Sequence, residues 1–257
     1  MRDLTEFAAQ TQPLLEVEGL RIGRSGGSLL DVPHLLLGGP GPTVILGPNG
    51  AGKSLLLRCL HGLIAPDRGQ VLQDGRALGT AERSGQAMVF QKPVLLRRSV
   101  AANLDFVLRR QRLDRRSRRA RIAALLAEAG LQGKARQPAR SLSGGEAQRL
   151  AILRALACAP RILFLDEPTS ALDPAATQQI EAMILCAARR GTRIVMVTHD
   201  VGQAYRLGRD IVLMQGGRVV EQGLVPDFFD APQSRAGRQF LAGALVIQRD
   251  RERNDLA

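Results

Sequence analysis

The stretch that decides the fold is Gly47-Pro48-Asn49-Gly50-Ala51-Gly52-Lys53-Ser54, a complete GxxxxGKS pattern. Its glycines allow the backbone to curl until several N–H groups point inward at phosphate oxygens. The β-branched run 43–46 precedes it as a predicted buried strand, and residues 54–60 follow it as a predicted helix. The positive end of that helix dipole favours an anion. Strand, loop and helix together predict a phosphate-binding loop.

Two side chains of this loop have expected roles in binding ATP with Mg²⁺. We expect Lys53 to reach the β- and γ-phosphates and the Ser54 hydroxyl to ligate the metal, while residues 47–52 bind phosphate through the backbone. An ordinary glycine-rich turn is the alternative interpretation. The predicted strand before the loop and the predicted helix after it argue against such a turn.

The chain on both sides of the loop alternates predicted strands with predicted helices. Strands are expected at residues 71–74, 87–90, 162–165, 194–197 and 211–214, and helices at 174–190 and 200–207. Such alternation implies a parallel α/β sheet. Residues 17–37 instead alternate apolar residues with glycine-rich breaks, which predicts short strands and turns. The expected fold is an α/β P-loop NTPase core with a mainly parallel sheet and an N-terminal antiparallel β subdomain.

An inserted helical subdomain is expected at about residues 92–158. Residues 99–130 are rich in Ala, Leu and Arg with helical spacing, and Pro93 and Pro138 bound them. The expected organisation is a single domain over residues 14–247, with flexible termini at 1–13 and 248–257.

The composition excludes several classes of protein. With 257 residues and 45% apolar residues, the chain can bury a substantial core, so disorder is not expected. It has no apolar run of 18 residues that would predict a membrane span, and Asp3 and Glu6 interrupt any secretory signal. Cys59, Cys158 and Cys186 stand far apart, without metal-ligand spacing. We interpret them as small buried or helix-packing residues in a reducing cytoplasm.

The formal net charge of +12 raises the question of an anionic partner. Aromatic residues make up only 3% of the chain and Trp is missing, so stacking platforms for nucleic acid are scarce. The charge is concentrated in Arg109–Arg121, which holds eight arginines against one aspartate. Three interpretations stay open: a solvated helix face, attraction to anionic lipid headgroups worth about 1 kcal/mol per basic residue, and nucleic-acid binding.

A second motif places two carboxylates at the end of a predicted strand. Four apolar residues, 162–165, lead directly into Asp166 and Glu167. Downstream of a phosphate-binding loop, this is the Walker B pattern. We expect Asp166 to hold Mg²⁺ through water and Glu167 to polarise the attacking water. For such a pair taken alone, a salt bridge would be the alternative.

A third motif predicts a second anion site. Ser143-Gly144-Gly145 opens an Ala- and Leu-rich helix, and a helix N-terminus of this kind attracts anions. One nucleotide cannot occupy two such distinct helix N-termini within one P-loop fold. The simplest resolution is that residues 143–145 bind the γ-phosphate of a nucleotide held by a second copy of the chain.

At these residues the sequence resembles the ATP-binding subunits of ABC transporters. Their LSGGQ signature is present as LSGGE in Leu142–Glu146, and the resemblance runs from about Leu14 to Val246. It implies that Gln91 senses Mg²⁺ and the γ-phosphate and links to the helical subdomain. It also implies that Asp173 lies in a D-loop at a dimer interface. His199, 33 residues after Asp166, would be the switch histidine that donates to the γ-phosphate.

One position departs from the family pattern. Family members usually place an aromatic ring against adenine shortly after the apolar position that Leu20 occupies, and residues 20–24 supply none. Arg24 would then stack its guanidinium plane on the base. A solvent-facing turn residue is the alternative interpretation of Arg24.

The resemblance also implies partners and a location. These are a second copy in an ATP-sandwich dimer, transmembrane permease subunits and, indirectly, a solute-binding protein, with the chain peripheral on the cytoplasmic face of the inner (plasma) membrane. Residues 88–104 are similar to importer ATPases for oxyanions, most of all those for tungstate. Molybdate importers usually carry a C-terminal anion-sensing domain, for which the chain after Pro226 is too short. Phosphate and polar amino-acid importers share the short architecture, and an importer of phosphate, molybdate or polar amino acids stays open as the alternative.

Two other functional classes are less consistent with the sequence. A soluble ABC ATPase acting on nucleic acid would explain the basic charge, but such proteins typically carry two ATPase units or a long coiled coil. A P-loop kinase would not need residues 143–145. We therefore do not expect a nucleic-acid partner.

Overall fold

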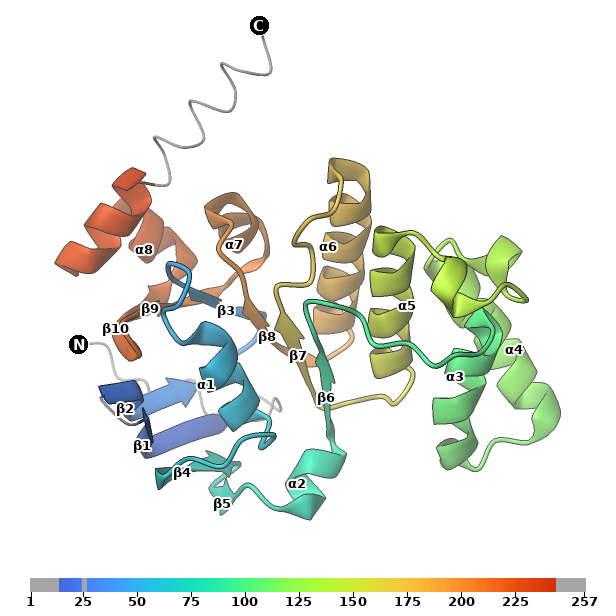
Figure 1. Ribbon diagram of the computed structural model, residues 1–257, viewed down its shortest axis with the longest axis horizontal. Helices are drawn as coiled ribbons and strands as arrows, with labels where there is room; N and C mark the ends of the chain where they lie inside the picture. Colours follow the sequence, from blue (N-terminus) through green and yellow to red (C-terminus); the bar gives the residue numbers. More distant parts are fainter. Residues whose placement is uncertain (1–13, 25–26, 244–257) are drawn as a thin grey trace, which may run out of the picture. The chain divides into compact units, whose positions relative to one another are not determined.

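The computed structural model describes residues 14–24 and 27–243, and it forms two compact units (Figure 1). Of the described residues, the first unit comprises those up to Gly79 together with those from Val195 onward, and the second comprises Thr80–Ile194. The segments predicted to be flexible, 1–13 and 248–257, lie outside the described residues. The predicted boundaries of the single domain and of the helical subdomain stay predictions.

The first unit contains an antiparallel sheet with the strand order β2-β1-β4-β5. Its strands are β1 (Leu15–Arg24), β2 (Gly27–Leu37), β4 (Arg68–Gln73) and β5 (Arg76–Ala77). The expected N-terminal antiparallel subdomain is confirmed, but the expectation of short strands is wrong, because β1 and β2 have 10 and 11 residues. Gly19 and Gly23 lie at register shifts inside β1, so these glycines form irregularities within one strand instead of ending it.

The same unit holds the parallel strands that position the phosphate-binding loop. β3 (Thr43–Leu46) lies between residues 195–197 of β8 (Arg193–Val197) and β9 (Asp210–Gln215), parallel to both. All four residues of β3 are buried. Helices α1 (Lys53–Leu60), α7 (Val201–Leu207) and α8 (Val225–Asp230) complete this part of the unit. Buried β-branched residues therefore form the strands that the sequence predicts.

One hairpin of this unit was not predicted. β10 (Arg218–Leu224) pairs antiparallel with β9 through a turn at Gly216 and Gly217, whose φ angles are 54° and 78°. Two consecutive positive φ angles match the turn that joins tight hairpins, and glycine adopts them without strain. The Gly-Gly pair after an apolar run was therefore a sequence signal for β10.

The second unit contains the parallel pair β6 (Gln86–Val89) and β7 (Ile162–Asp166), preceded by α2 (Thr80–Ser84). Every residue of β7 is buried. α6 (Pro174–Arg189) begins shortly after β7 and lies beside α5 (Gly144–Leu156) in Figure 1.

Helices predominate in the middle of this unit, as the sequence predicts. α3 (Val100–Leu108), α4 (Arg115–Glu128) and α5 pack around a shared apolar core. Its buried members are Val100, Leu104, Leu108, Ile122, Leu125, Leu126, Ala129, Leu131, Ala139, Leu150, Leu153 and Ala157. Short 3₁₀ turns at Arg109–Gln111, Gln132–Lys134 and Ala139–Ser141 connect these helices. None of the helices in the described ranges is long and apolar enough to cross a bilayer.

The cysteines follow the prediction only in part. Cys59 is buried in α1, and burial raises the pKa of its thiol to about 11. Cys186 is half-buried on α6, but Cys158 is exposed just after α5, so the prediction is wrong for Cys158. Cys158 follows the last turn of α5 and is therefore outside the packed face of that helix.

Candidate nucleotide site

The phosphate-binding loop depends on glycine for space and for backbone conformation. Gly47 has a φ of 147°, and a Cβ atom there would lie 2.2 Å from the Met214 carbonyl oxygen of β9. Gly50 and Gly52 also have positive φ angles, 78° and 95°. Residues 48–50 are exposed at the crown of the loop. The loop therefore curls tightly against the sheet while its crown faces solvent.

Lys53 is held across this loop by the loop itself. The side chain is 5% exposed, and its Nζ donates to the carbonyl oxygens of Gly47 at 2.7 Å and Pro48 at 3.0 Å. Gly52 is the N-cap residue of α1, has the left-handed conformation and makes no side-chain cap hydrogen bond. Ser54 follows, half-buried, in the first turn. This geometry gives a fixed cation beside a helix N-terminus that lacks a side-chain cap.

The parallel register brings His199 to the same edge of the sheet as this loop. Ile45 of β3 pairs with Val197 of β8, so Gly47 and His199 each come two residues after a paired position. The Thr198 amide donates to the Ile45 carbonyl at 3.3 Å, which continues the pairing up to the histidine. His199 is exposed at this edge. The first unit thus assembles the phosphate-binding loop and His199.

In the second unit the same geometry brings Gln91 and Glu167 together. Val89 of β6 pairs with Leu165 of β7, and Gln91 and Glu167 each follow two residues later. The Gln91 Nε2 donates to the Glu167 Oε2 at 3.2 Å. Asp166, the last residue of β7, is 3% exposed. The two predicted carboxylates and the predicted glutamine therefore share one strand edge.

Glu167 adopts a backbone conformation that is uncommon for a side chain of its type. Its φ is 45°, in the left-handed region. The Ser170 amide and hydroxyl both donate to the Glu167 carbonyl, at 3.2 Å and 3.1 Å, and close the turn that holds it. Strain of about 1–3 kcal/mol in such a position persists only where the surroundings impose it. Glu167 is half-buried at this turn, whereas Asp166 is buried.

The signature residues form a closed helix cap. Ser143 caps α5 and accepts from the Glu146 amide at 3.4 Å, while the Glu146 Oε2 accepts from the Ser143 amide at 3.1 Å. The Glu146 Oε1 also pairs with the Lys134 Nζ at 2.6 Å. The Lys134 ammonium and the Ser143 amide together lower the pKa of Glu146 from its usual value. The amides of Gly144 and Gly145 are not part of this capping box.

The start of α6 packs against this signature. Asp173 caps α6 by accepting from the Ala176 amide at 2.8 Å. A Cβ atom on Gly145 would lie 2.7 Å from the Ala176 Cβ, so this glycine allows the two helices to approach. Asp173 and the signature residues are thus held next to each other within one unit.

Gln148 is a connecting residue that sequence reasoning missed. It is 2% exposed on α5, and its Nε2 donates to the Phe90 carbonyl at 3.3 Å. The signature helix therefore fixes the residue just before Gln91. The available signal was its spacing of four residues from Gly144, which places Gln148 one helical turn along the same face.

Arg24 is the last residue of β1, and its side chain lies outside the described part of the chain. Its contact with adenine stays a prediction.

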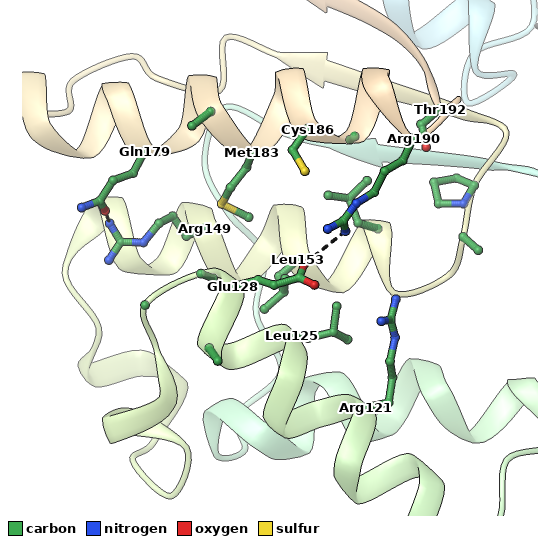
Figure 2. Close-up of a pocket in the computed structure, with 18 of the residues that line it drawn as sticks. Arg121, Leu125, Glu128, Arg149, Leu153, Gln179, Met183, Cys186, Arg190 and Thr192 are labelled. Atoms are coloured by element: carbon green, nitrogen blue, oxygen red, sulfur yellow. Dashed lines mark hydrogen bonds and ion pairs between the residues drawn. The ribbon is translucent and has the colours of Figure 1, made fainter.

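One pocket of the second unit, with a volume of about 890 Å³, is lined by none of the predicted site residues (Figure 2). Apolar side chains such as Leu125, Leu153 and Met183 line it together with arginines from α4, α5 and the end of α6. Arg149 pairs with Gln179, and Arg190 with Glu128 at 3.2 Å. Arg190 is the C-cap residue of α6, where its charge offsets the negative end of that helix.

Comparisons with known proteins agree with this architecture. A family model described as "ABC transporter" matches residues 41–170. The chain is 38% identical over 216 residues to the methionine import ATP-binding protein MetN of Corynebacterium efficiens, covering 80% of this chain but only 60% of that protein. It is 38% identical to the phosphate import ATP-binding protein PstB 2 of Natronomonas pharaonis, covering 90% and 87%. It is 37% identical to the Fe(3+) ions import ATP-binding protein FbpC of Streptomyces coelicolor, covering 91% and 69%.

A solved structure extends the agreement to the fold. CbiO1 of Clostridium perfringens, part of the ABC transporter complex cbiONQ, superposes with a TM-score of 0.76 at 30% identity, covering 84% of this chain and 90% of that one. The expected P-loop core, antiparallel sheet and helices are therefore confirmed as those of an ABC ATPase. By its motifs, its fold and its relatives, this chain belongs to the ABC transporter family.

Proposed function

We propose that this chain binds ATP with Mg²⁺ and hydrolyses it to drive an importer. The observation that carries this proposal is the contact between Gln91 and Glu167 at the carboxyl edge of β6 and β7, with Glu167 held in a left-handed turn. A carboxylate presented in this way, next to a buried Asp166, suits the orientation of a water molecule. The uncapped α1 and the buried Lys53 support the binding of phosphates.

The donor set fits Mg²⁺. Ser54, Gln91 and Asp166 offer a hydroxyl, an amide and a carboxylate oxygen, the hard ligands that this ion prefers. Within the described residues there is no group of three His, Cys, Asp or Glu side chains that would hold a metal by itself. Few protein ligands are needed, because Mg²⁺ usually completes its shell with phosphate oxygens and water. When bound, it would neutralise charge on the phosphates.

Hydrolysis would proceed by attack of water on the γ-phosphorus. Glu167 would accept a hydrogen bond from that water and draw its proton away as the new P–O bond forms. The bond between the γ-phosphorus and the bridging oxygen would break, which leaves ADP and phosphate. Gln91 would steady the Glu167 carboxylate, and His199 would donate a hydrogen bond to the γ-phosphate. Lys53 would stabilise the charge on the β- and γ-phosphates.

A second copy of the chain would complete each site. The amides of Gly144 and Gly145, which the capping box leaves out, would meet the γ-phosphate held by the other copy. Ser143 would contribute its hydroxyl, and Asp173 would lie at the interface between copies. Glu146 places a negative charge in the first turn of α5, which weakens the attraction of this helix N-terminus for free anions. Residues 143–145 would therefore bind a nucleotide only when a second copy of the chain presents it.

For the transported solute we propose an oxyanion, with tungstate as the leading candidate, on the similarity of residues 88–104. Permease subunits and a solute-binding protein would contact the solute directly. This chain would be peripheral on the cytoplasmic face of the membrane. The relatives named above import methionine, phosphate and Fe(3+) at nearly equal identity, so overall identity does not choose among solutes. Measuring the cellular content of tungsten, phosphate and methionine after deletion of the gene tests the choice. We expect loss of tungsten uptake alone. Loss of methionine or phosphate uptake would show that this other solute, and not tungstate, is transported.

The substitution Glu167→Gln tests the proposed hydrolysis. It should leave ATP binding intact and slow turnover by about 10²–10⁴-fold, since general-base help is typically worth that much. The variant should also accumulate as an ATP-bound dimer in size-exclusion chromatography. Glu128→Gln, an exposed glutamate of the same unit, is the matched control and should hydrolyse normally. Near-normal turnover of Glu167→Gln would remove Glu167 from the mechanism.

A further inference from the structure

Four arginines surround a small cleft in the second unit. The cleft has a volume of about 370 Å³ and is lined by Arg97, Arg98, Ser99, Arg136, Pro138 and Arg140. No acidic side chain lines it. The first two arginines precede α3, and the other two lie between α4 and α5. Two segments that are far apart in the sequence thus each contribute two positive charges to one cleft.

A buried asparagine fixes the segment that carries Arg97 and Arg98. Asn103 of α3 is 0% exposed, and its Oδ1 accepts from the Leu96 amide at 2.8 Å. Its Nδ2 donates to the carbonyls of Leu96 at 3.2 Å and Ser99 at 3.0 Å. These bonds hold the backbone on both sides of the arginine pair. The two side chains therefore project from a segment of fixed shape.

Backbone hydrogen bonds fix the other two arginines to this segment. The Ala139 amide donates to the Arg98 carbonyl at 2.9 Å, and the Val100 amide donates to the Gln137 carbonyl at 3.0 Å. Ser99 and Pro138 form an isolated antiparallel bridge between these bonds. Arg136 and Arg140 flank this bridged stretch. The backbone of both arginine-bearing segments is consequently fixed before any ligand arrives, which lowers the entropic cost of ordering these segments on binding.

These arginines differ from others in the same unit. Arg109 and Arg118 both pair with Asp105, and Arg190 pairs with Glu128. The four cleft arginines, in contrast, make no side-chain hydrogen bond or ion pair to any part of the chain that the structure describes. Four like charges around one cleft repel each other. A bound dianion would relieve that repulsion.

We propose that this arginine cleft binds one tetrahedral oxyanion of the phosphate type. Guanidinium groups match the oxygens of such an anion in bidentate pairs, and four of them exceed the charge of a single dianion. Pro138 is the only apolar side chain in the lining, so an acidic peptide would find no apolar anchor there. The anion is either free in solution, as phosphate or tungstate, or carried on a phosphomonoester lipid headgroup.

The position of the cleft suggests a consequence for hydrolysis. Arg97 follows Gln91 by six residues, and Arg140 precedes Ser143 by three. An anion bound by both arginine pairs would tie the segment after Gln91 to the segment before the signature. This regulatory consequence rests on the proposed function, whereas the binding of the anion does not.

Isothermal titration of the full chain with inorganic phosphate and with tungstate tests the binding. It is done without nucleotide and in a Lys53→Ala background, so that the phosphate-binding loop does not contribute. We expect saturable binding of one anion. The double substitution Arg98→Gln/Arg136→Gln should weaken it at least about tenfold, because two charge-assisted contacts are lost. The second pair, Arg97→Gln/Arg140→Gln, should do the same.

Arg115→Gln/Arg119→Gln is the matched control, since it removes the same charge from exposed arginines of α4 outside the cleft. It should change affinity less than about twofold. Equal losses in the cleft and control variants would overturn the proposal in favour of diffuse charge. Vesicles of phosphatidic acid in phosphatidylcholine form the second arm, and binding there without binding of free phosphate would assign the anion to a lipid. Binding of polyglutamate, with neither phosphate nor vesicles bound, would also overturn it.

Discussion

The two glycine-rich loops of this chain both open a helix, but they are prepared for anions in different ways. α1 begins at Gly52 without a side-chain cap, beside the buried Lys53. α5 begins at Ser143 with a complete capping box, and its Glu146 is paired to Lys134. The first loop is therefore built to attract phosphate in the isolated chain. In the second loop, the side chains of Ser143 and Glu146 already occupy the hydrogen-bonding groups of the capping box, and Glu146 places a carboxylate in the first turn of the helix.

The glycines of the two loops also serve different purposes. Gly47 combines a positive φ with a backbone carbonyl at the position of a Cβ atom, whereas Gly145 is helical and lies against a neighbouring helix. A glycine-rich motif thus combines conformational and packing requirements that the sequence alone does not separate. Matched pairs of substitutions separate them.

The largest effect is expected from Gly47→Ala compared with Gly50→Ala. The new Cβ at position 47 would lie 2.2 Å from a backbone oxygen of β9, which cannot move without disrupting the sheet, so we expect a loss above about 3 kcal/mol of unfolding free energy. At position 50 no atom lies within 4 Å, and only the left-handed strain of about 1–2 kcal/mol applies. Denaturant unfolding measures both. Equal losses would contradict the close approach to Met214.

A smaller effect is expected in the signature. Gly145→Ala would place its Cβ 2.7 Å from the Ala176 Cβ, and the resulting overpacking between α5 and α6 should cost about 1–3 kcal/mol. Gly144→Ala makes only an ordinary contact of 3.5 Å with Leu172 and should be neutral or slightly stabilising, because Ala favours helices. The melting temperatures of the two variants decide the point. If Gly144→Ala proves the more harmful, the packing described for α5 and α6 is wrong.

The capping glutamate predicts a mild dependence of stability on pH. Because Lys134 and Ser143 lower the pKa of Glu146 in the folded state, its contribution is complete above the usual glutamate pKa and is lost as the pH falls through the lowered folded value. Glu146→Gln should keep most of the cap and lose about 0.5–1 kcal/mol with the ion pair. The difference between wild type and variant should shrink in acid. If the difference in unfolding free energy between wild type and variant stays the same from pH 7 to pH 3, the ionised Glu146 carboxylate is not the cause of that difference.

The smallest effect concerns adenine. If phosphates held by the first loop supply most of the affinity, Arg24→Ala should weaken ATP binding only several-fold, since a contact of this kind is worth about 0.5–2 kcal/mol. Arg24→Tyr should strengthen it, and GTP should compete well with ATP in the unmodified chain. Titration of the three proteins with both nucleotides measures this. Constant affinities across the series would place adenine elsewhere.

The comparison also shows what the sequence could predict. Buried, largely apolar runs such as 43–46 and 162–165 identify the strands, and the residues that directly follow these runs identify the candidate site, because parallel strands end at one edge. The pairing of Gln91 with Glu167 follows from that register. The capping box of Ser143 and Glu146 was readable from their spacing of three residues, yet it was interpreted only as an anion site.

Other features depend on contacts distant in the sequence. Lys134 meets Glu146 only because a 3₁₀ turn folds back onto α5, and Gln148 reaches Phe90 across 58 residues. β1 continues through Gly19 and Gly23 because its pairing with neighbouring strands resumes after each irregular position. Local patterns contain no information about such partners, so these features emerged only from the structure.

The central claim is that the two loops act on one nucleotide from two copies of the chain. Lys53→Ala should lose nucleotide affinity, and Ser143→Arg should bind ATP as a monomer yet fail to close a dimer. Each variant alone should be inactive in hydrolysis. Mixing the two should restore activity through one composite site, made of an intact phosphate-binding loop from one variant and an intact signature from the other. A mixture that stays inactive, with heterodimers shown to form, would contradict the claim.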